Sequence, residues 1–477
     1  MSSLHPYHPP SARCRAGVAR RDVTPPVGIQ SRSFGAALHE TAEGVHRPFT
    51  ATALALAELE GDGSPMVLLT VDIGWLEKDE MAEFLDGVRE PLGLSHDRLL
   101  IAFSHTHAGA NLSSSMRDHP GGDKIRPYFE RLIRLCAEAG AEAIANLVPA
   151  WLTFGSGACD LAQNRDAWDE DSQQFVTGFN PDGEADDTVL VARVSSDGGS
   201  VLATLVNYGC HPTTLGPTNR LLSPDYIGAM REVMEDSFGA PCLFLLSPCG
   251  DTGPREGFVG DTAVADSNGR RLGFAAAAAV ESLLPAGTQL EYDGPIISGA
   301  TLGAWKRTKL DPPADDRSFV LRSRTLRIDL PIKPHESPDA LKAAHDQATR
   351  DLESAQASGD PIAIRDATAI RERARRRLLR GPTLPDGGTI PIDLHLWQIG
   401  DAFLLAVPAE PYSMLQRELR ARFADRPIFI SVVTNGTLAY LLPRDFYGEN
   451  LYQDWVSFPG PGGLELVLET VAATIPQ

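Results

Sequence analysis

The chain has 477 residues, of which 43% are hydrophobic, and a formal net charge of −20 at pH 7. This length is enough for one large domain or two to three ordinary domains with a substantial core. The negative charge would repel phosphate backbones and anionic lipid headgroups, so we expect neither nucleic acid nor membranes as partners. A small-molecule substrate is the better expectation, and homo-oligomerisation is left open.

The N-terminal residues and the cysteines bear on the cellular compartment of the protein. The segment MSSLHPYHPPSARCRAG carries prolines and charges where a signal peptide needs an apolar core, and no later segment has 18 uninterrupted apolar residues. The six cysteines are scattered without a C-x-x-C pair, which suits reduced thiols. We therefore expect a cytoplasmic protein, with Cys210 and Cys249 as small buried hydrophobic residues.

The predicted strands share one pattern, a short apolar run that breaks into a polar turn with Gly or Pro. In chain order these runs begin at Met66, Leu99, Val201, Cys242, Phe403 and Ile428. Helical periodicity lies between them, for example over residues 128–147 and 226–238. The alternation predicts an α/β fold, in which sites gather in the turns at the carboxyl ends of strands.

Residues 335–380 have a different composition, rich in Ala, Glu and Arg with a helical period. The break Gly359-Asp360-Pro361 predicts a helical hairpin, and residues 381–388 form a Pro/Gly-rich loop that returns to the core. The basic run 371–380 lies on the second arm. We expect it to be a solvated helix face and not a polyanion-binding surface, because the rest of the chain is acidic.

Four strand-end turns carry side chains that could bind a metal. His105 and His107 follow the run that begins at Leu99, and residues two apart in an extended segment point the same way. His211 follows the Val201 run, Glu410 the Phe403 run and Tyr440 the Ile428 run. Each has an ordinary reading when taken alone: a hydrogen-bonded histidine, a helix-entry glutamate, a buried tyrosine. A catalytic zinc site needs such ligands from separate elements.

In combination these motifs resemble the neutral/alkaline, non-lysosomal ceramidase family. The resemblance runs in order through GVARRDVTPPVG, SHTHAGAN, YGCHPTT, SPCGDTGP, AEPYSMLQRELR and NGTLAYLLP, of which SHTHAGAN is the most specific. It implies an α/β, mixed-sheet zinc-hydrolase domain over residues 1–477, with 335–380 as a helical hairpin insertion.

The resemblance also implies roles for individual residues. It implies one zinc per chain, with His105, His211, Glu410 and Tyr440 as ligands. His107 would be catalytic, through proton transfer or polarisation of the substrate.

Further roles follow for residues around these ligands. Asp251 is assigned to the catalytic group and, like Asp225, would fix histidine tautomers or loop geometry. Arg165 would orient a substrate oxygen or form a structural salt bridge.

Two departures from the family pattern shape the expected function. Gly253, on the substrate-binding side, stands where the family has an active-site serine, and we expect no C-terminal β-domain, because the sequence stops at Gln477 soon after the last motif. We therefore expect a zinc-dependent hydrolase that cleaves an amide or ester of a small soluble substrate with metal-activated water. The alternatives are a true ceramidase that hydrolyses N-acylsphingosine, a lactonase or peptidase, and a non-catalytic zinc-binding protein.

Overall fold

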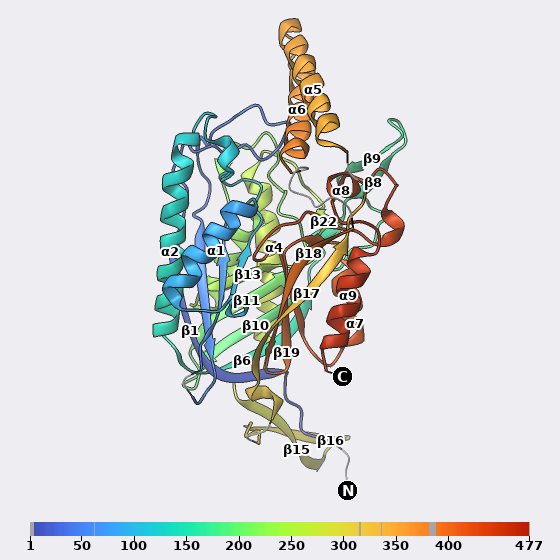
Figure 1. Ribbon diagram of the computed structural model, residues 1–477. Helices are drawn as coiled ribbons and strands as arrows, with labels where there is room; N and C mark the ends of the chain where they lie inside the picture. The colour runs from blue at the N-terminus through green and yellow to red at the C-terminus, as the bar shows by residue number, and fades with distance from the viewer. Residues whose placement is uncertain (1–3, 62, 314–315, 335, 381–387, 477) are drawn as a thin grey trace.

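Two β-sheets packed face to face form the centre of the molecule (Figure 1). The computed structural model describes residues 4–61, 63–313, 316–334, 336–380 and 388–476. The larger sheet has eight strands, in the order β13 (Cys242–Leu246), β11 (Val201–Tyr208), β10 (Thr188–Ser196), β6 (Val148–Ala158), β1 (Ser11–Asp22), β3 (Thr50–Ala57), β4 (Met66–Val71) and β5 (Leu99–Phe103). The smaller sheet has four, in the order β17 (Leu321–Pro331), β18 (Thr389–Ile399), β19 (Ala402–Val407) and β21 (Ile428–Val432).

Each sheet is covered on both faces, by the other sheet on one side and by helices on the other. Side chains on both faces of the central strands are therefore buried and apolar. In β4, Leu68 points into the core between the sheets, which it shares with Leu404 of β19. Its neighbour Leu69 points the other way, into the second core that lies under the helices. This alternation explains why the predicted strands are continuous apolar runs, as strands covered on both faces are.

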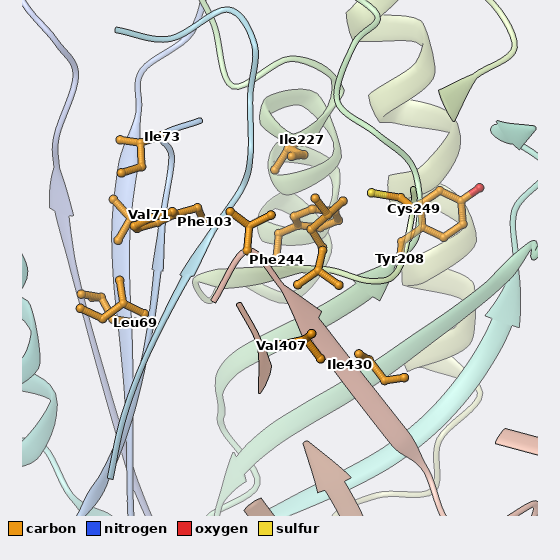
Figure 2. Close-up of a cluster of buried hydrophobic side chains, with 14 of the residues drawn as sticks. Leu69, Val71, Ile73, Phe103, Tyr208, Ile227, Phe244, Cys249, Val407 and Ile430 are labelled. Atoms are coloured by element: carbon orange, nitrogen blue, oxygen red, sulfur yellow. The ribbon is translucent and has the colours of Figure 1, made fainter. Parts of the chain in front are cut away.

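Helices cover the outer faces of both sheets. The larger sheet carries α1 (Lys78–Leu92), α2 (Ile125–Ala145), α3 (Tyr226–Phe238) and α4 (Thr262–Glu281); the smaller carries α7 (Met414–Arg422) and α9 (Gly463–Thr474). The molecule is thus a mixed α/β structure, as predicted, and both helices named from the sequence are present. Figure 2 shows part of the core, where Phe103 and Phe244 of the larger sheet lie near Val407 and Ile430 of the smaller.

Three parallel strand pairs end at the same end of the molecule. These pairs are β4 with β5, β11 with β13, and β19 with β21. All six predicted strand runs are confirmed, and they are the strands of these three pairs. Their carboxyl-terminal turns therefore meet in space, which is the condition for a shared site.

The predicted helical hairpin is also confirmed. It consists of α5 (Pro338–Ser358) and α6 (Pro361–Arg380), inserted between β17 and β18, and it projects from the body of the molecule (Figure 1). Gly359 ends α5 with φ 70°, a left-handed conformation that suits glycine. The predicted loop over 381–388 lies almost wholly outside the described residues.

The expectation that the basic run of α6 is a solvated face is wrong for Arg375 and Arg376, whereas Arg373 is exposed. The side chains of Arg375 and Arg376 are only 18% and 31% exposed. The reason is that this part of α6 packs against Trp75, Trp455 and the segment 33–35.

Short elements complete the chain. They are β2 (Gly44–Val45), β7 (Ala162–Asn164), β8 (Asp166–Asp169), β9 (Gln174–Thr177), β12 (Leu221–Leu222), β14 (Thr252–Pro254), β15 (Thr288–Ile297), β16 (Thr301–Lys309), β20 (Glu410–Pro411), β22 (Tyr440–Leu441) and α8 (Tyr452–Val456). The six cysteines are buried free thiols, as expected. Within the described ranges, the helices fall short of the length and apolarity that crossing a bilayer requires.

Candidate metal centre

The four residues proposed as ligands come together at the shared strand ends. His105 follows β5 and His211 follows β11, while Glu410 and Tyr440 lie in the two-residue strands β20 and β22. These two short strands pair in parallel with Glu410 directly opposite Tyr440. Main-chain hydrogen bonds between the two strands therefore place Tyr440 beside Glu410, although the two residues are 30 positions apart in the sequence.

Three histidines and one carboxylate form the centre of the site. The ligating atoms of His105, His107 and His211 all lie within 4.8 Å of one another. Glu410 Oε2 is 3.4 Å from His105 Nε2 and 4.0 Å from His211 Nε2. His107 Nε2 is 3.1 Å from His211 Nε2. The arrangement presents several nitrogen and oxygen donors to one small volume, which is the donor set that zinc favours.

The backbone conformation at His105 is strained. Strand β5 ends at Phe103, and His105 has φ 62°, in the left-handed region that non-glycine residues seldom adopt. The prediction that strand alternation points both histidines the same way is therefore wrong in its reason, although the two rings do meet. Val433 (φ 48°) and Ala439 (φ 76°), in the loop that carries Tyr440, are strained as well. Such strain clusters where a site fixes the backbone.

The hydrogen bonding of His105 fixes its tautomer. Its Nδ1 lies 2.9 Å from the carbonyl oxygen of Gly74, which can only accept, so Nδ1 carries the proton and donates it. In the neutral ring, which is the form that binds a metal, the lone pair is then on Nε2, which faces Glu410. Among the described residues, His105 Nε2 and Glu410 Oε2 are buried polar atoms without a hydrogen-bond partner. Two such atoms facing each other fit a cation held between them.

The protonation states also suit a metal. Burial, with the nearby cations, lowers the pKa of His107 and His211 well below the ordinary histidine value, so both rings are neutral near pH 7. Burial alone would raise the pKa of Glu410, but His105, Arg165 and the Tyr440 hydroxyl outweigh it, and the pKa lies below its usual value. Neutral imidazoles and an ionised carboxylate are the forms that bind a metal.

His107 lies close to both of the other histidines. Its ring packs 5.6 Å from Trp75 and 5.4 Å from Phe34. It also lines a small cavity with Ser33, Phe34 and Ala108. This residue is placed both to reach a substrate in the cavity and to act as a further ligand, and the predicted catalytic role stays a prediction.

Arg165 lies against Tyr440 and against the turn after β13. Its Nε and Nη2 donate to the carbonyl of Gly250 at 3.1 and 2.8 Å, and its guanidinium stacks 5.5 Å from the Tyr440 ring centre. The side chain is buried. Burial raises the pKa of Tyr440 well above its ordinary value, although the Arg165 cation opposes this. Arg165 thus holds the tyrosine and the turn in place.

Asp251 and Asp225 shape the loops and do not contact the histidine rings. Asp251 accepts hydrogen bonds from the backbone N–H and the hydroxyl of Ser413, both at 2.6 Å. This fixes the segment that follows Glu410. Asp225 accepts from the Leu215 N–H at 2.9 Å and from the Tyr226 N–H at 2.7 Å, where α3 begins. Of the two roles suggested by the sequence, loop geometry is the one these contacts support.

Gly253 lies in β14, next to Arg165 and Thr213. A Cβ atom built at Gly253 would meet Arg165 Cδ at 3.7 Å and Thr213 Oγ1 at 3.9 Å, which are ordinary contacts. The position therefore has room for a serine, and the glycine is not required by the backbone.

Several residues of the site were not predicted from the sequence. Trp75 packs on both His105 and His107, and Cys249 Sγ lies 3.6 Å from His211 Nδ1. Trp75 follows the strand run that begins at Met66, so its place at a strand end was visible. Arg376 lies over the Trp75 ring because the inserted helix α6 packs there, and no local sequence pattern predicts this contact.

Fold and site together define a mixed α/β protein with a buried group of histidines and a glutamate, able to hold a metal, at the carboxyl ends of its strands. The family model for the N-terminal part of neutral/alkaline non-lysosomal ceramidases matches residues 15–254. The chain belongs to this family. The matched region includes all three histidines, whereas Glu410 and Tyr440 lie beyond it.

Individual relatives are distant in sequence. Neutral ceramidase A of Dictyostelium discoideum is 22% identical over 222 residues, which are 44% of this chain and 30% of that protein. The structure of neutral ceramidase from Pseudomonas aeruginosa matches with a TM-score of 0.64 at 17% identity, over 99% of this chain and 76% of that one. A ceramidase structure described as complexed with C2 has a TM-score of 0.64 at 16% identity, over 98% and 75%. These structures share the fold.

Proposed function

We propose that this protein is a zinc-dependent hydrolase of N-acyl amides. The observation that carries the proposal is the facing pair of buried, unpartnered atoms, His105 Nε2 and Glu410 Oε2, at 3.4 Å. Without a metal, Arg165 and a protonated His105 offset the charge of the buried Glu410 carboxylate, and a bound cation would take over this role from His105. With His211 and Tyr440 this pair would form a mixed nitrogen and oxygen set for one zinc ion. When bound, zinc lowers the pKa of a coordinated water and polarises an acyl oxygen.

The chain's own residues would supply orientation and proton transfer. His105 is held by the Gly74 carbonyl with its Nε2 lone pair directed into the site. His107 borders the cavity, where its neutral ring could accept a proton and pass it to a leaving amine. Arg165 keeps Tyr440 beside Glu410. Trp75 and Phe34 pack against His107 and limit its motion.

Ceramide is the substrate that the relatives' names suggest, and family membership supports it over the small soluble amide expected from the sequence. The small soluble substrate keeps one specific observation in its favour. Gly253 removes the hydroxyl that the family pattern places there, in a position with room for one. The bond type common to both candidates is an amide, and the proposal rests on that.

One comparison of substrates tests the proposal. Zinc-loaded protein is incubated with detergent-solubilised long-chain ceramide, short N-acyl amides, esters and lactones, and kcat/KM is compared. Amide cleavage that is lost on chelation and restored by zinc is the expected result, and the ratio of ceramide to short amides identifies the substrate class. Inactivity on the whole panel, with zinc bound, would favour the non-catalytic zinc-binding alternative.

A further inference from the structure

The basic face of α6 packs on Trp75 and Trp455, next to the candidate metal centre. This helix carries seven arginines against two acidic residues, Asp366 and Glu372, in a chain whose net charge is −20. Part of this basic face is turned toward the body of the molecule and not toward solvent. A positive surface next to a site attracts anionic ligands and repels cationic ones, even in a protein whose net charge is negative.

Arg376 reaches the histidines through one aromatic ring. Its Nη2 donates to the carbonyl of Ser33 at 3.0 Å, and its guanidinium lies 6.0 Å from the Trp75 ring centre. Trp75 in turn packs 5.6 Å from His107 and 6.1 Å from His105. Arg376 therefore contacts Ser33, a residue that lines the same cavity as His107, although Arg376 is not itself part of that lining.

Helix α6 also packs against α8. Trp455 of this helix lies between two arginines of α6, Arg373 at 5.1 Å and Arg377 at 5.2 Å from its ring centre. The same short helix carries Tyr452, whose ring is 6.0 Å from that of Tyr440. Helix α6 therefore contacts both Trp75, beside the histidines, and α8, beside Tyr440, and Figure 1 shows its lower end beside α8.

The acidic partners of these arginines do not neutralise all of them. A single carboxylate, Glu372, accepts hydrogen bonds from both Arg375 at 2.7 Å and Arg376 at 3.0 Å. Arg377 pairs with Glu336. Arg373 is exposed and stacks on Trp455. Glu77 also acts on Arg375, so among the described residues the positive charge of this stretch rests on Arg373, whose stacked guanidinium stays weakly hydrated and able to bind anions.

We propose that the substrate is an N-acyl amide that carries a carboxylate or phosphate several bonds from the scissile carbonyl, and that Arg373 and Arg376 bind this anionic group. The inference rests on the proposed amide hydrolase function and adds the substrate class to it. Planar guanidiniums bind such oxyanions with two parallel hydrogen bonds. Neutral ceramide has no such group and should be the poorer substrate.

A matched substrate pair tests the anion preference directly. Glutaryl-p-nitroanilide and valeryl-p-nitroanilide have acyl chains of equal length, and only the first ends in a carboxylate. We expect kcat/KM to favour the glutaryl compound by about tenfold, the size of one hydrogen bond to a charged group. The ratio should fall toward one in Arg373→Gln/Arg376→Gln and as NaCl is raised in the wild type. Arg365→Gln is the control, because Arg365 lies on the same helix near the hairpin turn and pairs with Asp366.

A binding experiment separates this inference from the proposed function. Glutaryl and valeryl hydroxamates, whose hydroxamate group binds zinc, are titrated into zinc-loaded protein by calorimetry. Tighter binding of the glutaryl compound, lost in the Arg373→Gln/Arg376→Gln variant and kept in Arg365→Gln, supports the inference. Equal binding of both compounds overturns the anion preference and leaves the hydrolase intact. Binding of neither compound overturns both.

Discussion

Removing the Asp251 carboxylate should loosen the segment that carries Glu410 and so weaken the metal centre. Asp251 accepts two hydrogen bonds from Ser413, three residues after Glu410, and the Gly250 N–H donates to the carbonyl of Pro411. In Asp251→Ala both hydrogen bonds to Ser413 are lost, and the buried backbone N–H of Ser413 has no acceptor. The prediction concerns both stability and metal affinity.

The size of the stability effect follows from these contacts. Hydrogen bonds to a charged group contribute about 1.5–3 kcal/mol each, so two give about 3–6 kcal/mol. Burial raises the pKa of Asp251, which shows that desolvation offsets part of this, and a net loss of about 3 kcal/mol is expected. With an unfolding entropy of about 2.1 cal/mol/K per residue, a chain of 477 residues loses about 3 °C in Tm.

The assay combines thermal unfolding with zinc affinity measured by competition against a chromophoric chelator. We expect Asp251→Ala to weaken zinc binding by about 10–100-fold, as loss of a group that orients a ligand does. Asp401→Ala is the matched control. Asp401 is buried and accepts the Ser11 N–H at 2.8 Å, but it lies at the opposite end of β19 from Glu410. If the two variants lose stability and both keep wild-type zinc affinity, the positioning role of Asp251 is refuted.

Three further predictions concern the site itself. His105→Ala, His211→Ala and Glu410→Ala should each lose bound metal and hydrolysis, whereas His107→Ala should keep metal and lose turnover; loss of zinc in His107→Ala, measured by elemental analysis, would show that His107 is a ligand. Gly253→Ser should fold with a Tm within about 1 °C of the wild type, because the added atoms meet only ordinary contacts, and a large drop in thermal unfolding would refute this. The metal-free protein should lose stability as the pH falls below about 6.5. Since the folded pKa values of His107 and His211 lie below the unfolded value, the unfolded state binds more protons there, and each ring contributes about 1.4 kcal/mol per pH unit until its folded pKa is reached. Denaturant unfolding of the wild type and of His107→Gln/His211→Gln at pH 7.5 and 5.5 measures the difference, and an equal loss in both proteins would contradict it.

Much of the fold could be predicted because its strands are short and covered on both faces. The runs that begin at Met66, Leu99 and Phe403 are β-rich, apolar and ended by polar turns, so local sequence determines where they start and stop. The hairpin of α5 and α6 has equally local signals, a serine cap at Ser337 and the Gly359 break. The pairing of the strands into two packed sheets has no local signal, because it depends on contacts between distant segments.

The structure brings together the residues predicted as ligands, but the geometry that does so was less predictable. Alternation along a strand was a poor guide at His105, because the ring is aimed by a left-handed residue after the strand has ended. The pairing of Glu410 with Tyr440 depends on two-residue strands too short to recognise from periodicity. Part of the basic run of α6 was misread as a solvated face, because its packing against Trp75 and Trp455 is a tertiary contact.

The metal content of the purified protein tests the central claim most directly. Protein purified without chelator and offered zinc should contain about one zinc per chain by elemental analysis, and Glu410→Ala treated identically should contain almost none. The facing atoms His105 Nε2 and Glu410 Oε2 require this result if they bind one ion. A wild-type protein with less than about a tenth of an equivalent of zinc, or a Glu410→Ala variant that keeps the full equivalent, would contradict the account.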